Sequence, residues 1–427
     1  MTNKRLLLFT AHYPYLLGHE HVFIEPELPY LLEQFDKITI FPSMKCGNQR
    51  PLPEGVSCEP GLATALNKNP RKLPVKHFIR GLFNRLFWDE FVSFIPLSLH
   101  PRAIKRSSVW IDEARLVSDW VHKYIKKEQI NLEDCLLYTY WLETSASGIC
   151  LAKKLSPKIK IVSRTLRYDL YEELYTPAFF PLRKKTLKGL DMLVIISNDG
   201  CQYLSSKYPQ FSNKFKVSVM GVFSSEQINS SSGDGVRRIA SCSNLIQVKR
   251  VNLILEGLQH LARLHPDQPI TWRHFGSGPL MGKLMTLMKD SPRNLSVELQ
   301  GETPNDAIID FYANNPIDVF INASSSEGIP VSIMEAQSFG IPVIATDVGG
   351  NRESVNNKNG HLLSRDPSDV EIADAIWDVL TSADYGNKRI ASFETWQQKF
   401  DANKNYSEFA RMIRSMLNGS CNKGIDE

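Results

Sequence analysis

The sequence lacks the paired cysteines and clustered histidines that bind structural metals. Its seven cysteines are scattered singly along 427 residues, at positions 46, 58, 135, 150, 201, 242 and 421. Without a Cys-x-x-Cys pair or histidines at ligand spacing, no metal site is expected. An odd, dispersed set of thiols is typical of a reducing compartment, so we predict a cytoplasmic protein with free cysteines.

Long apolar runs are also absent. The apolar run within residues 1–10 is too short for a secretory signal. No stretch reaches the roughly 18 apolar residues of a membrane-spanning helix. Any membrane contact is therefore expected to be peripheral. The formal net charge is only +4, which gives no argument for nucleic acid as a partner.

Composition and length favour two globular domains. With 42% hydrophobic and 22% charged residues, the chain fits neither a disordered nor a fibrous protein. Domains usually have about 100–200 residues, so a chain of this length predicts two. A stretch rich in serine and glycine, residues 224–235, divides the chain near its middle. We predict an N-terminal domain over 1–225, a C-terminal domain over 226–390, and a helical segment over 391–427 that returns to the first domain.

Short buried strands alternate with helices in both halves, which indicates an α/β fold with parallel sheets. In the first half, strands are predicted at residues 6–10, 37–42, 136–140, 159–163 and 192–197, with helices at 23–35, 77–125 and 183–190. In the second half, strands are predicted at 238–242, 270–275, 295–299, 318–322 and 342–346, with helices between them. Ligands of such sheets bind at the carboxyl ends of the strands, so functional residues are expected in the loops that follow them.

The strongest chemical signal is the strand–loop–helix segment 318–346. Glu327 lies in the loop after the strand, and Glu335 follows eight positions later in the helix. Gly328 allows the backbone to approach a ligand closely, and Pro330 suits the first helical position, where no N–H is needed. The free amides at the helix N-terminus, with the helix dipole behind them, predict a cradle for a diphosphate.

This segment resembles the Glu-x7-Glu signature of retaining glycosyltransferase family 4, which has the GT-B fold. Phe275–Pro279 (Phe-Gly-Ser-Gly-Pro) is similar to the family's glycine turn beside the nucleotide, and Val248–Asn252 is similar to the segment with its diphosphate-binding lysine. In the N-terminal half, residues 18–25, 138–141 and 163–171 resemble a branch of bacterial surface polysaccharide synthesis. The resemblance implies two Rossmann-like, doubly wound domains that face each other across a cleft.

The resemblance also implies a role for each matching residue. Glu327 and Lys249 are the implied catalytic residues: Glu327 contacts donor-sugar hydroxyls, and Lys249 balances the charge of the diphosphate. Glu335 is implied to hold the ribose. The rest of the implied donor site comprises Gly328, Ile329, Pro330, Val331, Ser332, Asn244, Gly276, Gly278 and Pro279. The implied acceptor site, in the N-terminal domain, comprises Gly18, His19, Glu20, Arg164, Arg167 and Asp169.

Two positions depart from the family pattern. Asn244 stands where relatives usually carry an arginine that binds the diphosphate, and Leu166 stands where they often carry a sugar-contacting histidine. Arg164 and Arg167 are candidates to supply the missing charge. We predict a retaining hexosyltransferase that uses a UDP- or GDP-linked sugar and needs no metal. Two alternatives stay open: a sugar-nucleotide epimerase of the same fold, and a non-catalytic donor-binding partner of a transferase.

A basic and aromatic stretch, residues 68–88, has two interpretations. Helical spacing would gather much of its apolar set on one face, which suits an anionic membrane surface. The same spacing suits a helix that packs on the domain core with a solvated basic edge. Because acceptors in this kind of pathway are often lipid-linked, we predict a saccharide or lipid-linked saccharide acceptor. The protein is then expected to be cytoplasmic or peripheral on the inner face of the cell membrane.

Overall fold

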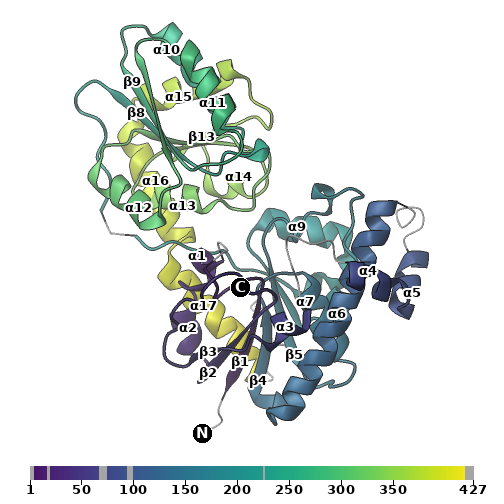
Figure 1. Cartoon of the computed structure of the whole chain (residues 1–427). Helices are drawn as coiled ribbons and strands as arrows, with labels where there is room; N and C mark the ends of the chain where they lie inside the picture. The colour runs from purple at the N-terminus through teal and green to yellow at the C-terminus, as the bar shows by residue number, and fades with distance from the viewer. Residues whose placement is uncertain (1–3, 17–19, 67–74, 94–99, 225–226, 419–427) are drawn as a thin grey trace. The chain divides into compact units, whose positions relative to one another are not determined.

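The computed structural model describes residues 4–16, 20–66, 75–93, 100–224 and 227–418, and it contains two compact units (Figure 1). The N-terminal unit comprises the chain up to Ile196, Gly200–Ser218, and the chain from Tyr406 onward. The C-terminal unit comprises Ser197–Asp199 and Val219–Asn405. The sequence predicts that the two domains end at residues 225 and 390. In the structure the units divide after residues 218 and 405, because the chain from 219 to 224 and helix α16 (Tyr385–Lys399) belong to the C-terminal unit.

The N-terminal unit is built on a seven-stranded parallel sheet with the strand order β3-β2-β1-β4-β5-β6-β7. Its strands are β1 (Arg5–Thr10), β2 (Lys37–Pro42), β3 (Val56–Cys58), β4 (Cys135–Thr139), β5 (Lys160–Thr165), β6 (Met192–Ile195) and β7 (Phe215–Val217). Its helices are α1 (His21–Ile24), α2 (Leu28–Leu32), α3 (Gly61–Leu66), α4 (Val75–Leu82), α5 (Arg85–Ser93), α6 (Pro101–Lys127), α7 (Thr144–Ala152), α8 (Arg183–Gly189) and α9 (Asn198–Lys207). Short 3-10 helices are η2 (Leu132–Asp134), η3 (Glu172–Leu174), η4 (Pro209–Lys214) and η7 (Met416–Asn418).

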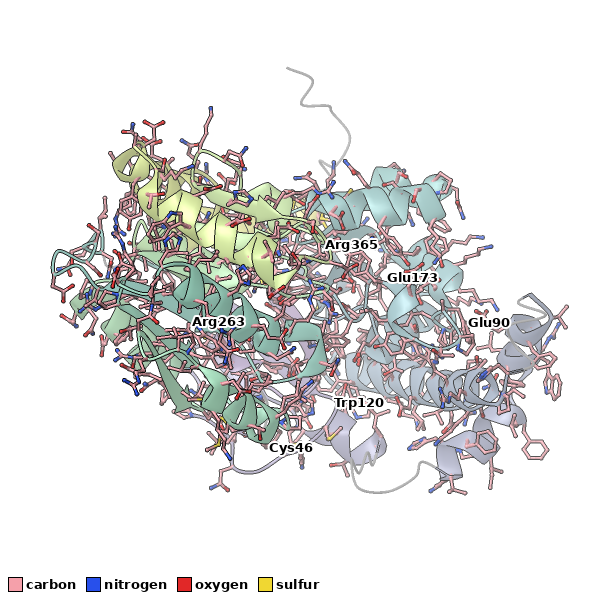
Figure 2. All side chains as sticks on the ribbon, turned by 90° about the horizontal axis from the view of Figure 1, so that it is seen from above. Cys46, Glu90, Trp120, Glu173, Arg263 and Arg365 are labelled. Carbon is pink, nitrogen blue, oxygen red and sulfur yellow. The ribbon has the colours of Figure 1, made fainter. Side chains whose placement is uncertain are left out.

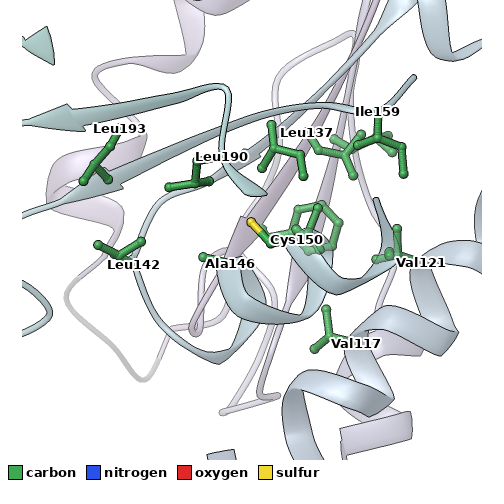
Figure 3. Close-up of a cluster of buried hydrophobic side chains, with 14 of the residues drawn as sticks. Val117, Val121, Leu137, Leu142, Ala146, Cys150, Ile159, Leu190 and Leu193 are labelled. Carbon is green, nitrogen blue, oxygen red and sulfur yellow. The ribbon is translucent and has the colours of Figure 1, made fainter. Parts of the chain in front are cut away.

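Helices α6 and α7 close one core of the N-terminal unit (Figure 3). Val117 and Val121 of α6 lie one helical turn apart and therefore share a face, which packs against α7 and its Cys150. The two helices approach closely at Gly148. A Cβ atom there would lie 2.5 Å from the carbonyl oxygen of Ala114, so the approach requires glycine.

An aromatic cluster holds α6 against β2. Trp120, labelled in Figure 2, stacks on Tyr124 one turn later with 5.1 Å between the ring centroids. Both rings meet Phe41 of β2 edge-on, at 5.1 and 5.0 Å. Such pairs add to the stability gained from burying the rings, so this end of α6 is fixed on the sheet.

Helix α17 (Ala402–Ser415) passes from the C-terminal to the N-terminal unit, where it lies beside α2 (Figure 1). Its Phe409 ring lies 5.5 Å from that of Tyr138 in β4. The Arg414 Nε atom donates a 3.0 Å hydrogen bond to the carbonyl oxygen of Gln34. Helix α17 therefore packs against the N-terminal unit through both β4 and the segment after α2.

The C-terminal unit is built on a six-stranded parallel sheet with the strand order β10-β9-β8-β11-β12-β13. Its strands are β8 (Arg237–Cys242), β9 (Ile270–Phe275), β10 (Leu295–Gly301), β11 (Val319–Asn322), β12 (Val343–Thr346) and β13 (Gly360–Leu363). Its helices are α10 (Val251–Leu264), α11 (Met281–Leu287), α12 (Asn305–Asn314), α13 (Val331–Ser338), α14 (Asn351–Ser354), α15 (Asp369–Thr381) and α16 (Tyr385–Lys399), with the 3-10 helices η5 (Gln247–Lys249) and η6 (Met288–Asp290).

Both sheets are parallel throughout the strand pairs of the described residues, which confirms the predicted fold class. The central strand β11 is buried along its whole length, as expected of a parallel strand covered on both faces. Among the described residues, none of the helices combines the length and the apolar character needed to span a bilayer. The described cysteines are all free.

Candidate donor site

The loop between β11 and α13 lies at the carboxyl end of the C-terminal unit's central strand. Pro330, with φ of −68°, is the N-cap residue of α13, so it lies directly before the first helical residue and near the helix start, as the sequence predicts. The amides of Ile333 and Met334 both reach the Pro330 carbonyl oxygen, at 3.1 and 3.3 Å. The amides of Val331 and Ser332 come before any partner within the helix and remain available to a ligand.

Glu327 and Lys249 form an ion pair beside this helix start. The Lys249 Nζ atom donates to Glu327 Oε1 at 2.5 Å, and Asn322 Nδ2 lies 3.4 Å from the same oxygen. Glu327 is 6% exposed, whereas the Lys249 side chain is 23% exposed. The ammonium has three N–H donors, so two remain for an anionic ligand.

The two glycines 349 and 350 set the position of the Glu327 loop. Gly349 has φ of +52°, and a Cβ atom there would lie 1.9 Å from the carbonyl oxygen of Glu327. The Gly350 amide donates to the Gly328 carbonyl oxygen at 2.7 Å. A side chain at either glycine would displace the predicted catalytic loop, so the glycines are needed for its geometry.

Arg250, the residue after Lys249, has a structural role. Its Nε atom donates to the Ala323 carbonyl oxygen at 2.6 Å, and its Nη2 atom donates to that of Ser324 at 3.0 Å. Its Nη1 atom pairs with Asp366 at 2.9 Å. This guanidinium fastens the loop after β11 and is not free to replace Lys249 as a ligand of phosphate.

Glu335 lies in α13 and is 5% exposed. Burial raises the pKa of its carboxyl group, and a hydrogen bond from Asn305 Nδ2 to Glu335 Oε1, at 2.7 Å, lowers it in part. Asn305 was not identified from the sequence. It is 30 residues away from Glu335 in the chain, and nothing in the sequence pattern connects the two positions.

Gly276 and Gly278 bring the loop after β9 against the loop after β8. Their φ angles are +133° and +156°, and a Cβ atom at Gly276 would lie 2.0 Å from the Ser243 carbonyl oxygen. The Leu245 amide donates to the Ser277 carbonyl oxygen at 2.9 Å. Asn244 and Pro279 are exposed on these two loops. The predicted donor residues therefore come from neighbouring strand ends of one sheet.

Cys242, the last residue of β8, lies close to both parts of the site. Burial raises the pKa of its thiol to about 12, the Glu335 carboxylate also raises it, and Lys249 lowers it. Both charges act on this thiol, so Glu335, the predicted ribose ligand, and Lys249, the predicted diphosphate ligand, lie near the end of β8. Among the described residues, no group of three or more His, Cys, Asp or Glu side chains is arranged to hold a metal ion.

The predicted acceptor residues are mostly internal to the N-terminal unit. Glu20 accepts hydrogen bonds from the amides of Ala11, His12 and Tyr13 and thus holds the loop after β1. Asp169, which is fully buried, accepts from the amides of Leu142 and Leu166 at 2.8 and 2.9 Å. Gly18 and His19 lie outside the described residues.

Arg164 is buried as well. Its guanidinium pairs with Glu27, which is equally buried, and lies over the Phe409 ring, 4.1 Å from the centroid. As placed here, Arg164 cannot contact an acceptor, so the structure corrects its predicted role to that of a core ion pair. Arg167 is half-buried. Of the predicted acceptor residues that the structure describes, it is the one with an accessible side chain.

Comparisons with known proteins show what the sequence and the fold of this chain are similar to. Residues 225–393 match the sequence family described as glycosyl transferases group 1. No curated protein matches the chain by sequence. Among solved structures, the apo form of the lipopolysaccharide outer core galactosyltransferase WaaB is 12% identical, with a TM-score of 0.66 over 96% of this chain and 99% of that one.

Two further solved structures contain UDP. HepE of Anabaena in complex with UDP is 16% identical, with a TM-score of 0.62 over 96% of this chain and 100% of that one. The pneumococcal O-GlcNAc transferase GtfA, in complex with UDP and GlcNAc, is 15% identical, with a TM-score of 0.54. That match covers 70% of this chain and 60% of GtfA. Residues 225–393 thus match the model of that family, and the two Rossmann-like units have the GT-B fold of these similar structures.

Proposed function

We propose that the protein is a glycosyltransferase that moves a hexose from a nucleotide sugar to a saccharide acceptor, with retention of the anomeric configuration. The observation that carries the proposal is the Lys249–Glu327 ion pair at the start of α13, with Glu335 further along the same helix. This arrangement offers a cation and free amides that can bind a diphosphate, and two carboxylates that can accept hydrogen bonds from sugar hydroxyls. Retention follows from the resemblance to family 4.

In the proposed reaction, negative charge develops on the leaving diphosphate. Lys249 and the amides of Val331 and Ser332 stabilise that charge, which is usually the largest contribution to catalysis. Glu327 accepts hydrogen bonds from donor-sugar hydroxyls and keeps Lys249 oriented through their ion pair. Because this cation and the helix N-terminus supply positive charge at the diphosphate, we propose that no metal ion is required.

The donor is proposed to be a UDP-sugar, because two of the similar structures contain UDP. Thermal shift against UDP and GDP, each with and without EDTA, tests this. UDP is expected to raise the Tm, and EDTA is expected to leave the increase unchanged. A larger increase with GDP would overturn the proposed base, and loss of the UDP effect in EDTA would overturn the proposed independence from metal.

Product analysis separates the proposal from its alternatives. The protein is incubated with UDP-sugars, with and without a bacterial membrane extract as the source of acceptor. A transferase releases UDP in proportion to new saccharide only when the extract is present. An epimerase would change the nucleotide sugar without extract. Binding of the donor without either product in any extract would support a non-catalytic partner.

The acceptor is proposed to be lipid-linked, and the protein is then peripheral on the inner face of a bacterial membrane and takes part in surface polysaccharide synthesis. Helices α4 and α5 and the turn between them expose five large apolar side chains, and Phe83 in that turn is the most exposed, at 86%. The other four are Val75, Ile79, Trp88 and Val92. Lys76 and Arg85 are exposed on the same helices. Apolar and cationic side chains together favour an anionic bilayer.

This surface is expected to bind vesicles that contain phosphatidylglycerol. Replacing Lys76 and Arg85 by glutamine should weaken binding by about 1 kcal/mol per charge, and added salt should weaken it further. Arg80 is left unchanged because it pairs with Asp112 at 3.5 Å. The matched control replaces Lys154 and Lys160, which are exposed elsewhere on the N-terminal unit. Binding is measured by sedimentation with vesicles at low salt. Equal binding by both double variants would show that this surface does not bind the membrane.

A further inference from the structure

A cavity of about 310 Å³ lies on one face of α6 in the N-terminal unit. Ligand pockets usually have volumes of roughly 300–1,000 Å³, so the cavity is large enough for a small chemical group. Six of its lining residues are three or four positions apart in α6 and therefore share a face of that helix. The lining comprises Arg102, Lys105, Arg106, Val109, Trp110, Glu113 and Thr144.

Part of the cavity wall is fixed by internal contacts. Arg106 donates hydrogen bonds to the carbonyl oxygens of Phe179, Thr176 and Pro177, at 2.8 to 3.1 Å. Burial lowers the pKa of its guanidinium. The Trp110 Nε1 atom donates to Ser147 Oγ at 3.0 Å. Arg106 and Trp110 are therefore held in place before any ligand arrives.

Two other cations on the cavity are not engaged in this way. Arg102 and Lys105 are exposed, and within the described parts of the chain neither forms an ion pair. One carboxylate, that of Glu113, also lines the cavity, where it is 7% exposed. Three cations against one carboxylate leave the cavity positive, so its charge suits an anion.

The cavity is also apolar on one side. Val109 lines it, and Trp110 belongs at the same time to the small cluster in which α5 packs on α6 through Phe87 and Ile111. Helix α5 exposes Trp88 to solvent, as described above. An anion that also carries an apolar chain would therefore find a complementary surface for both of its parts.

The cavity lies near the edge of the sheet where ligands of this fold class bind. Thr144 is the first residue of α7, and it follows the loop at the carboxyl end of β4. Strand β4 is central in the sheet, between β1 and β5. The carboxyl ends of such strands are where open α/β sheets bind ligands, so a group held here is well placed to serve as part of an acceptor.

We propose that this cavity binds the phosphate or diphosphate group of a lipid-linked acceptor. Arg102 and Lys105 contact the phosphate oxygens, and the first part of the apolar chain lies against Val109 and Trp110. The inference deepens the proposed function and rests on it for the identity of the ligand as an acceptor. The binding site itself is defined by the residues of α6.

The test uses farnesyl diphosphate as a probe, in calorimetric titrations of the full chain below the probe's micellar concentration. Replacing Arg102 and Lys105 by glutamine removes two charge-assisted contacts, and affinity should fall by about tenfold or more. The matched control is Lys123→Gln with Lys126→Gln, two exposed lysines near the other end of α6, and its affinity should equal that of the unchanged protein. Circular dichroism confirms that both variants fold.

Two further probes test the amphiphilic nature of the ligand. Inorganic pyrophosphate and farnesol are each expected to bind more weakly than farnesyl diphosphate. Pyrophosphate that binds equally well would overturn the lipid part of the proposal, and farnesol that binds equally well would overturn the anion part. Equal affinity of the two double variants for farnesyl diphosphate would overturn the site. UDP affinity, measured in the same samples, should be unchanged, and its absence in every sample would instead contradict the proposed function.

Discussion

Replacing Lys249 by alanine is expected to lower the turnover number by about 10²–10³-fold, the usual effect of removing one group that stabilises developing negative charge. Lys249 Nζ is held 2.5 Å from Glu327 Oε1, next to the free amides of α13. The charge that Lys249 supplies is needed most when the diphosphate leaves. Affinity for uridine, which carries no phosphate, should therefore change little. Steady-state kinetics with a UDP-sugar, together with uridine titrations, measure the two quantities.

Two controls accompany this variant. Lys289→Ala removes an exposed lysine of the same unit and should leave turnover unchanged. Because alanine at 249 also leaves the buried Glu327 carboxylate without its cation, Lys249→Arg is needed to separate charge from folding. The arginine variant should keep more of the turnover than the alanine variant. Near-normal turnover in Lys249→Ala would show that this lysine does not stabilise the leaving group.

Arg250 does not weaken this test. It would be the obvious substitute cation, since it is adjacent in sequence and Asn244 supplies no charge. Its guanidinium, however, is hydrogen-bonded to the carbonyl oxygens of Ala323 and Ser324 and paired with Asp366. Moving Arg250 to a phosphate would leave those carbonyl oxygens without their donors, which costs free energy at a largely buried site.

The parallel sheets could be predicted because their strands are short, buried and nearly all apolar. The bounds of the helices are less evident in the sequence. The predicted helix over 23–35 is two short helices, α1 and α2, because Pro26 and Pro29 lack the N–H groups that a continuous helix would need. Residues 77–125 also divide into separate helices, α4, α5 and α6. Strands β3, β7 and β13 have three or four residues each and were not predicted, since such short runs give little periodicity.

In the candidate site, contacts between residues close in sequence could be predicted, whereas contacts between residues far apart in the chain could not. The Glu327 loop and α13 are contiguous in sequence, so their arrangement could be inferred from residue types alone. The partner of Glu335 could not, because Asn305 approaches it only through the folding of α12 against α13. For Arg164, the sequence predicts a role in binding the acceptor, whereas the structure has a buried ion pair. Arginine is rarely fully buried unless it is paired, and its partner Glu27 lies 137 positions away in the chain.

Glu335→Gln is expected to have opposite effects on donor binding and on stability. Glutamine keeps an oxygen that can accept from Asn305 Nδ2, which now lies 2.7 Å from the carboxylate, but it removes the negative charge. If Glu335 binds the ribose diol, losing a charged hydrogen-bond partner should weaken uridine binding by about tenfold to a hundredfold. Titration of uridine against both proteins measures this effect.

The stability effect follows from the raised pKa of Glu335, which is caused first by burial. Between the unfolded pKa and the higher folded pKa, the native state binds more protons than the unfolded state, so stability decreases as pH rises through that interval. Above the folded pKa, the buried charge destabilises the native protein in full. Glu335→Gln removes that charge and should therefore have a higher Tm than the unchanged protein at pH 7, with the difference shrinking as the pH is lowered through the folded pKa.

The same titration links stability to donor binding. In the unchanged protein, uridine affinity should fall as the pH is lowered through the folded pKa of Glu335, because the protonated carboxyl group is a weaker acceptor. In Glu335→Gln the affinity should be low and independent of pH over that range. A variant with unchanged uridine affinity would remove Glu335 from the donor site. A variant with lower stability at pH 7 would mean that the ionised carboxylate stabilises this fold, contrary to the argument from burial. A residue that weakens the fold and strengthens the ligand complex is the pattern expected of a binding site, since its charge is compensated only when the ligand is present.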